Sequence, residues 1–188
     1  MWWVELLNSI VALLESGAGG GGGAFESIAT ATGTGSSGTI TFSSIPSTYQ
    51  HLQIRGNILP TTAAGNLFLR VNGLSTSIYA YHLLYGNGTA ATATGSATQS
   101  RVYIESTTIT KDTTNPTSFI IDIQDYASTT KNKTIRNFYG LDKNGSGEVV
   151  LSSGLVVDTQ AIGSLTVNLL SASFATSSTV SLYGIKGA

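Results

Sequence analysis

The chain of 188 residues contains no cysteine and only two histidines. The absence of cysteine excludes disulfides, thiolate nucleophiles and cysteine-based metal sites, so stability has to come from packing or from partners. The histidines, His51 and His82, have no regularly spaced carboxylates near them in the sequence, so a first-row metal ion would lack ligands. We therefore expect neither a metal centre nor a cofactor.

Charged side chains are also scarce. Asp, Glu, Lys and Arg make up 10% of the chain, against about 25% in soluble globular proteins. The formal net charge is -1 and the basic residues form no cluster, which argues against a nucleic-acid-binding protein. Low charge density gives little repulsion between copies, and this favours a protein that is packed into an assembly.

The N-terminal residues 1–16 are predicted to form an amphipathic helix. Its apolar side chains recur at helical spacing. They are Trp2, Trp3, Leu6, Leu7, Ile10, Leu13 and Leu14. A helix this short is marginal alone in water, so we expect these side chains to anchor the protein to a partner. The apolar stretch is shorter than the roughly 20 residues of a membrane span, and it lacks the basic start of a signal peptide.

Residues 17–24 form a glycine-rich linker in this interpretation. Each glycine loses more backbone entropy on ordering than any other residue, so the run favours a flexible tether over a helix or strand. The sequence thus predicts an anchor joined by a tether to a domain at residues 25–188.

Residues 25–188 are predicted to form one all-β domain, an antiparallel β-sandwich of the jelly-roll kind. Short alternating segments rich in Thr, Val, Ile and Tyr are separated by Gly, Ser and Asn, and no long helical pattern recurs. Residues 86–99, almost all Gly, Ala, Thr and Ser, are expected to form a long loop. Strands are predicted near residues 25–32, 38–42, 51–58, 66–71, 78–85, 101–105, 118–124, 134–141, 148–152, 164–170 and 179–185.

Two short motifs resemble ligand-binding loops. Residues 33–38 match GxGxxG, but a strand follows where a dinucleotide site needs a helix, so a glycine-rich hairpin loop is predicted. Residues 142–148 have the first oxygen-bearing positions of a calcium loop, yet Ser153 occupies the position of its final Glu. Asn144 and Gly145 predict a type I′ hairpin turn instead, and a weak metal contact at residues 142–148 stays open.

Catalytic motifs are missing from the sequence. A Ser-His-Asp triad could be drawn from many serines, His51 or His82, and several aspartates, but no GxSxG elbow supports it. Asp122 and Asp125 resemble a glycosidase pair only in composition, because their spacing at a strand end points them to different faces. We predict that the protein is not an enzyme.

Four tyrosines, Tyr79, Tyr81, Tyr85 and Tyr103, leave a second function open. Their rings would suit stacking against sugars, although alternating tyrosines also occur as ordinary sheet packing. A host-surface polysaccharide-binding module of a tail fibre, using these rings or the loop at residues 86–99, is therefore the alternative hypothesis.

Several segments resemble a family of tailed-bacteriophage virion proteins. The similar segments are residues 25–30 (FESIAT), 40–56 (ITFSSIPSTYQHLQIRG), 81–86 (YHLLYG), 121–126 (IDIQDY), 142–147 (DKNGSG) and 182–187 (LYGIKG). The resemblance covers nearly everything after residue 24 and carries no catalytic motif. It implies a capsid-decorating, tail or fibre-associated structural protein of phages of aquatic bacteria, including cyanophages.

The leading expectation is therefore a phage virion structural protein. Its N-terminal anchor would bind other virion proteins and display the sandwich on the capsid or tail surface. A homo-oligomer is expected, with a trimer favoured, and neither nucleic acid nor a membrane is an expected partner.

Overall fold

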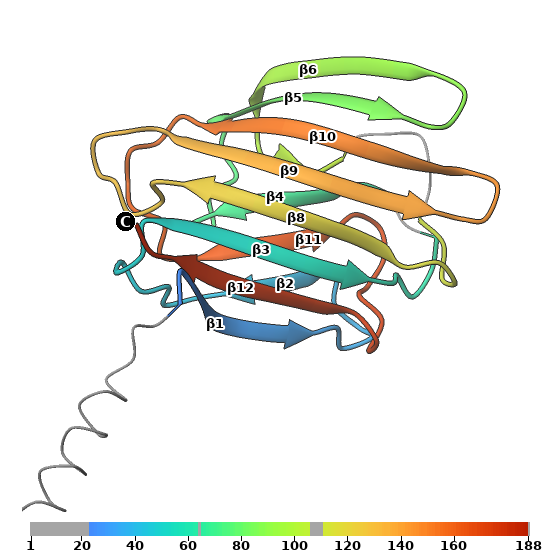
Figure 1. The fold of residues 1–188 in the computed structure, drawn as a ribbon, viewed down its shortest axis with the longest axis horizontal. Helices are drawn as coiled ribbons and strands as arrows, with labels where there is room; N and C mark the ends of the chain where they lie inside the picture. Colours follow the sequence, from blue (N-terminus) through green and yellow to red (C-terminus); the bar gives the residue numbers. More distant parts are fainter. Residues whose placement is uncertain (1–22, 64, 106–110, 188) are drawn as a thin grey trace, which may run out of the picture.

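The computed structural model describes residues 23–63, 65–105 and 111–187. These residues form two antiparallel sheets packed face to face, which confirms the predicted all-β sandwich (Figure 1). The predicted helix and nearly all of the linker lie outside the described residues. None of the described segments is a helix long and apolar enough to cross a membrane.

The larger sheet has eight strands in the order β1-β12-β3-β8-β9-β10-β5-β6. Their bounds are β1 Phe25–Thr32, β3 His51–Ile58, β5 Tyr79–Gly86, β6 Ala91–Gln99, β8 Thr117–Gln124, β9 Lys133–Asp142, β10 Gly147–Val156 and β12 Thr179–Ile185. The smaller sheet has the order β2-β11-β4-β7. Its strands are β2 Thr39–Phe42, β4 Leu67–Val71, β7 Val102–Tyr103 and β11 Leu165–Leu169.

The chain passes repeatedly between the two sheets, as in a jelly roll. Strands β2 to β5 alternate between the small and the large sheet, and so do β10, β11 and β12. Strand β12 pairs with β1 on one side and with β3 on the other. The beginning and the end of the domain therefore lie side by side (Figure 1).

Alternation of side chains explains why both sheets share one core. Along β8, β9 and β10, every second residue is buried and the residues between them face outward. Inward residues such as Ile54, Ile121 and Val150 meet Leu67 and Val167 of the small sheet, and all five are fully buried. Each such side chain contributes about 1.5–3 kcal/mol through burial.

Two sequence predictions about loops are wrong. The expected loop at residues 86–99 is largely strand β6, which pairs with β5. Residues 33–38 do not close a hairpin, because β1 and β2 belong to different sheets. Gly33 is needed there because a Cβ would lie 2.1 Å from the Ala175 carbonyl oxygen.

The predicted hairpin at Asn144 and Gly145 is confirmed. Their φ angles are 54° and 120°, the positive values that such a turn requires. The turn joins β9 to β10, and the Lys143 N–H donates to the Ser146 carbonyl at 2.7 Å.

Candidate functional site

The seven anchor side chains between Trp2 and Leu14 lie outside the described residues, so their role stays a prediction. The described residues present a second apolar surface, on the outer face of the large sheet. This is the face toward the reader in Figure 1.

A row of exposed apolar side chains crosses this face. Ile120, Phe138, Leu151 and Leu84 come from β8, β9, β10 and β5, and each is the register partner of the next. Their exposed fractions are 38%, 51%, 53% and 51%. Ala93 of β6 is the register partner of Leu84 and continues the line. These five residues are the apolar row.

The apolar row is part of a larger patch. Besides the four large side chains in the row, Val149 of β10 points outward beside it, and Leu155 of β10 points outward beyond Ser153. Contiguous exposed apolar surface of this kind marks an interaction site more often than scattered single side chains do.

A charged row runs parallel to the apolar row. On each strand its residue is two positions away from the apolar one and lies on the same face of the sheet. Asp122, Arg136, Ser153 and His82 are consecutive register partners on β8, β9, β10 and β5. Asp122 Oδ1 accepts a hydrogen bond from Gln53 Nε2 at 2.7 Å, which fixes the carboxylate on the surface. The face therefore combines apolar contact area with oriented charge.

The position of His82 depends on a glycine in β6. A Cβ at Gly95 would lie 2.4 Å from the His82 Cδ2 atom, so the imidazole lies directly over the bare backbone of the edge strand. The ring is thereby held close to the sheet rather than projecting from it.

Shallow hollows flank the two rows. One of about 650 Å³ lies between His82, Leu84, Arg136 and Leu151. A second, of about 360 Å³, shares Arg136 and Leu151 and extends to Ile120. The face is thus uneven enough to accept side chains from a partner.

Strand β6 forms the edge of the large sheet beside this face. Its nine residues, ATATGSATQ, carry no charge and are exposed along most of the strand. Natural proteins usually protect edge strands with lysine, proline or a cover, because unpaired backbone groups invite another chain. Strand β6 therefore extends the uncharged surface of the apolar patch to the edge of the sheet.

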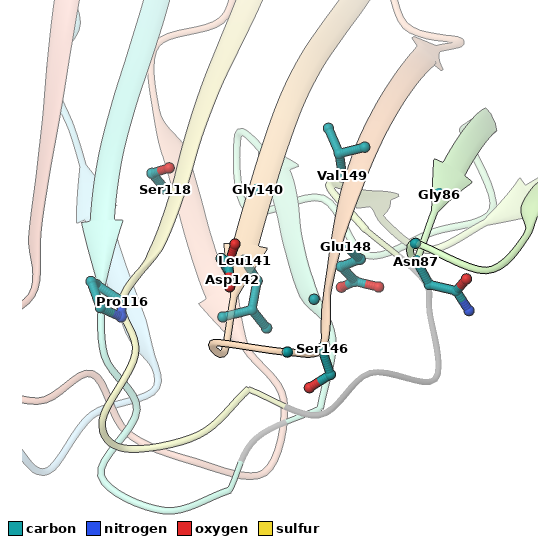
Figure 2. Close-up of a pocket in the computed structure, with 13 residues that line it drawn as sticks. Gly86, Asn87, Pro116, Ser118, Gly140, Leu141, Asp142, Ser146, Glu148 and Val149 are labelled. Atoms are coloured by element: carbon teal, nitrogen blue, oxygen red, sulfur yellow. The ribbon is translucent and has the colours of Figure 1, made fainter.

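A separate depression of about 800 Å³ lies beside the β9–β10 hairpin (Figure 2). Asp142 points outward there, and its Oδ1 accepts a hydrogen bond from the Asn144 N–H at 2.8 Å. Glu148 is the register partner of inward-facing Leu141 and is only 5% exposed. The two carboxylates therefore lie on opposite faces of the hairpin. Among the described residues, no group of three His, Asp or Glu side chains is placed to hold a metal ion.

A buried ion pair lies inside the sandwich, next to Tyr139 of β9. Lys111 and Glu105 are paired and are 1% and 0% exposed. Glu105 Oε1 also accepts the Leu67 N–H at 2.6 Å, and Lys111 Nζ lies 5.4 Å from the centroid of the Tyr139 ring. Burial, followed by the nearby Glu105 and Glu148 carboxylates, raises the pKa of Tyr139. These groups are sealed from solvent, so the geometry favours a structural role.

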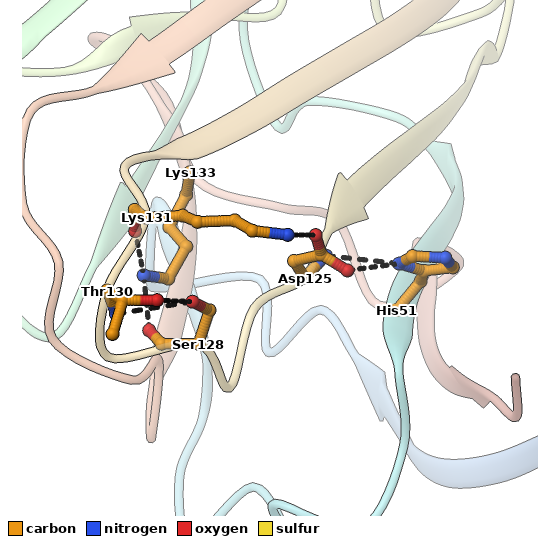
Figure 3. A network of polar contacts seen from close by, with 6 residues as sticks. All are labelled: His51, Asp125, Ser128, Thr130, Lys131 and Lys133. Carbon is orange, nitrogen blue, oxygen red and sulfur yellow. Dashed lines mark hydrogen bonds and ion pairs between the residues drawn. The ribbon is translucent and has the colours of Figure 1, made fainter.

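A polar network occupies the turn after β8 (Figure 3). His51 Nδ1 accepts the Asp125 N–H at 3.0 Å, and Lys131 Nζ donates to Asp125 Oδ2 at 2.9 Å. The hydrogen bond from Lys131 is the main cause that lowers the pKa of Asp125. Lys133 Nζ donates to three backbone carbonyls, including that of Ser128, and burial lowers the pKa of this amine. These hydrogen bonds and the ion pair hold the turn after β8 in one conformation.

Of the hypothetical triad, the structure brings His51 and Asp125 together, with 3.7 Å between His51 Nδ1 and Asp125 Oδ1. In the described ranges, no serine or threonine hydroxyl is hydrogen-bonded to His51 or His82. Asp122 lies on the outer sheet face, whereas Asp125 lies at the end of β8 with a φ of 47°. The two carboxylates thus occupy different environments, as their spacing predicted.

The tyrosines considered for sugar stacking belong largely to the core. Tyr79 and Tyr81 are 1% and 8% exposed. The Tyr79 hydroxyl donates to the Leu74 carbonyl at 2.9 Å, and the Tyr81 and Tyr103 rings pack edge to face at 5.2 Å. Tyr79 and Tyr81 therefore offer no free ring face to a sugar.

No protein-family model and no curated protein matches the chain. Among solved structures, the chain is similar to a protein of unknown function from Shewanella oneidensis MR-1. The identity is 9% and the TM-score 0.23, over 88% of this chain and 77% of that chain. At this identity and TM-score, the similarity establishes no function for the chain.

Proposed function

We propose that the protein is a non-enzymatic structural protein of a tailed-phage virion, held on the capsid or tail surface by its N-terminal segment. The observation that supports this most is the exposed apolar patch on a domain that is poor in charge. A face of this kind suits lasting contact with protein neighbours, because protein interfaces bury apolar surface and exclude charge from their centre.

The N-terminal segment supplies the attachment in this proposal. Burial of large side chains such as Trp3, Leu6 and Ile10 contributes about 1.5–3 kcal/mol each, and several copies on one particle bind together more firmly than one. The glycine-rich residues 17–24 would separate this contact from the sandwich, so that the anchor and the domain need not be oriented relative to each other.

Deletion of residues 1–15 in the phage genome tests the attachment. We expect the truncated protein to be made and folded but to be lost from purified particles, measured by quantitative mass spectrometry of virions. Normal occupancy of the truncated protein would contradict the proposal.

Point variants give a matched control for this deletion. Serine at Trp3, Leu6, Ile10 and Leu13 removes the apolar stripe, and we expect occupancy to fall as it does for the deletion. Serine at Glu5, Asn8 and Glu15 changes the same segment away from the stripe and should leave occupancy near normal. Equal losses in both sets would show that the apolar stripe is not what binds.

The non-enzymatic part of the proposal needs its own experiment. We expect host capsule or lipopolysaccharide to keep its chain length after incubation with the purified protein. Depolymerisation would overturn this part. Reproducible binding of residues 23–188 to a glycan array would favour the alternative, a polysaccharide-binding module.

A further inference from the structure

We propose that the outer face of the large sheet pairs with the same face of a second copy of this chain. The two copies would be related by a two-fold axis that runs parallel to the strands, between β9 and β10. This inference goes beyond the virion role, because the pairing is a property of the isolated protein. It rests on how the residues of the face map onto themselves.

The four large side chains of the apolar row are self-complementary about this axis. Rotation by 180° places β9 of one copy opposite β10 of the other, and β8 of one copy opposite β5 of the other. Phe138 of one copy then meets Leu151 of the other, and Ile120 meets Leu84. The four large apolar side chains of each copy are thus covered by apolar side chains, while Ala93 of β6, the fifth member of the row, lies opposite Arg55 of β3.

The charged row also maps onto a complementary row. Asp122 of one copy lies opposite His82 of the other, and Arg136 lies opposite Ser153. A carboxylate therefore faces an imidazole, which can donate an N–H or carry positive charge, and the guanidinium faces a hydroxyl. A two-fold axis through β9 would instead place Arg136 of one copy opposite Arg136 of the other. Because these are like charges, the axis between β9 and β10 is more favourable.

Shape agrees with chemistry in the neighbouring row. Gly140 and Val149 are register partners on β9 and β10, so the axis places each opposite the other. A Cβ on Gly140 would meet no atom within 4 Å, which leaves open space on this face, while Val149 is 45% exposed. A protruding side chain thus faces a bare backbone position on the other copy.

The face is large enough for a stable interface. Six neighbouring strands in sheet order, β3, β8, β9, β10, β5 and β6, lie about 4.8 Å apart, and successive outward residues on a strand lie about 6.8 Å apart. Six strands and four rows of residues therefore cover roughly 800 Å². A standard protein interface buries about 800 Å² per partner. Two sheets stacked in this way pack about 10 Å apart with strands within about 30° of each other.

A second copy explains the surface better than a glycan does. Sugars stack on aromatic rings, but only one of the four large side chains in the apolar row, Phe138, is aromatic. The others are aliphatic and suit a protein partner.

The mass of the full-length protein in solution tests the pairing. We expect light scattering after size exclusion to give a dimer, twice the 19.5 kDa of the chain. Leu151→Asp places a carboxylate opposite Phe138 of the other copy and should weaken dimerisation roughly 100-fold or more. Leu170→Asp is the matched control, because Leu170 is 43% exposed but follows strand β11 of the other sheet, and it should remain dimeric.

Three outcomes of this experiment would overturn the proposal. They are a wild-type monomer at the highest soluble concentration, a trimer whose mass is unchanged by Leu151→Asp, and equal weakening by the two aspartate substitutions. Circular dichroism of both variants shows whether each remains folded. If Leu151→Asp unfolds the chain, Leu84→Ser replaces it as the test of the same apolar row.

Charge variants test the position of the axis. His82→Asp places two carboxylates opposite each other and should weaken the dimer about tenfold, whereas His82→Lys should leave it at least as tight. The double variant His82→Asp with Asp122→Lys exchanges the charges and should recover part of the loss. If His82→Asp and His82→Lys weaken the dimer equally, the proposed register is wrong.

Chemical crosslinking gives a further test, because the protein has no cysteine of its own. Facing sheets are about 10 Å apart, too far for a disulfide but within reach of a short bismaleimide. A mixture of Ser118→Cys and Gly86→Cys chains should crosslink far more than either variant alone, because the axis places these two positions opposite each other at about 10 Å, whereas two copies of the same position lie about 17 Å apart. Equal crosslinking in the mixture and in the separate variants would contradict the two-fold arrangement.

Discussion

Gly56 shows how closely the core constrains a single residue. It lies on β3 opposite Phe119 of β8, and a Cβ at this position would lie 2.2 Å from the Cζ atom of that ring. The contact is with the ring of Phe119, a core side chain that is 2% exposed. Any side chain at Gly56 must therefore displace part of the core.

Gly56→Ala should lower the free energy of unfolding by about 1–3 kcal/mol, because overpacking forces strained side chains or backbone shifts. Gly163→Ala is the control, since a Cβ there meets nothing within 4 Å. Urea denaturation should show the first variant destabilised and the second within about 0.5 kcal/mol of wild type. Equal stability of the two variants would argue against the tight Phe119 contact.

Lys111 and Glu105 supply a second prediction, about buried charge. Lys111→Met leaves the Glu105 carboxylate buried without its cation and should cost about 3–5 kcal/mol of stability. Adding Glu105→Gln removes the stranded charge while keeping an oxygen for the Leu67 N–H, so the double variant should recover much of the loss. Chemical denaturation of the single and double variants measures the recovery. If the double variant is less stable than Lys111→Met alone, buried charge is not the cause.

Strand β1 is fastened at its start by a polar cluster. Glu26 accepts hydrogen bonds from Lys186 Nζ at 2.5 Å and from the Tyr49 hydroxyl at 3.0 Å. The bond from Lys186, followed by that from Tyr49, lowers the pKa of Glu26 below its ordinary value of 4.5. A carboxylate with a lowered pKa stabilises the fold above about pH 4.5, and this stabilisation is lost as the pH falls through the lowered value.

Glu26→Gln should therefore be less stable than wild type at pH 7, and the difference should narrow at acid pH. Urea denaturation at pH 7 and at about pH 3 measures both differences. Because the cluster is exposed to solvent, we expect a small effect. A gap of the same size at both pH values would exclude the Glu26 charge as its source.

The strands also show how far the sequence can be interpreted. Those with clear alternation, such as β1, β3 and β12, have the predicted bounds, because one face is buried and the other is solvated. Strand β6 differs from the predicted loop because its Ala, Thr, Gly and Ser residues cover no core and so show no hydrophobic alternation in the sequence. Strand β10 runs to Val156, beyond the predicted end at residue 152, because Ser153 and Gly154 interrupt the apolar alternation in the sequence.

The apolar row could not be found from the sequence. Each of its members is one outward hydrophobic residue in an otherwise ordinary strand, and single exposed hydrophobics are common. Only the pairing of β8, β9, β10 and β5 places Ile120, Phe138, Leu151 and Leu84 in one line. That information lies in the register between strands, whereas local patterns determine only which face a residue takes.

For the chain as a whole, removal of either end should have very different effects. A chain that stops at residue 178 lacks β12, loses buried Val180 and Leu182, and leaves β1 without its strand partner and β3 with a free edge. This loss is comparable to the total stability of about 5–15 kcal/mol, so we expect no cooperative thermal unfolding. A chain that starts at residue 23 keeps every described strand and should unfold cooperatively, as circular dichroism can show. Cooperative unfolding of the chain ending at 178 would contradict the central role of β12.

The position of β12 between β1 and β3 also has a consequence for synthesis in the cell. While the ribosome is still translating, β1 has no partner in the large sheet and β3 has a free edge, so the domain cannot close until residue 185 has emerged. Until then the nascent chain exposes strands that other nascent copies can bind. Slow translation or a chaperone at this stage would therefore decide how much protein reaches the folded state.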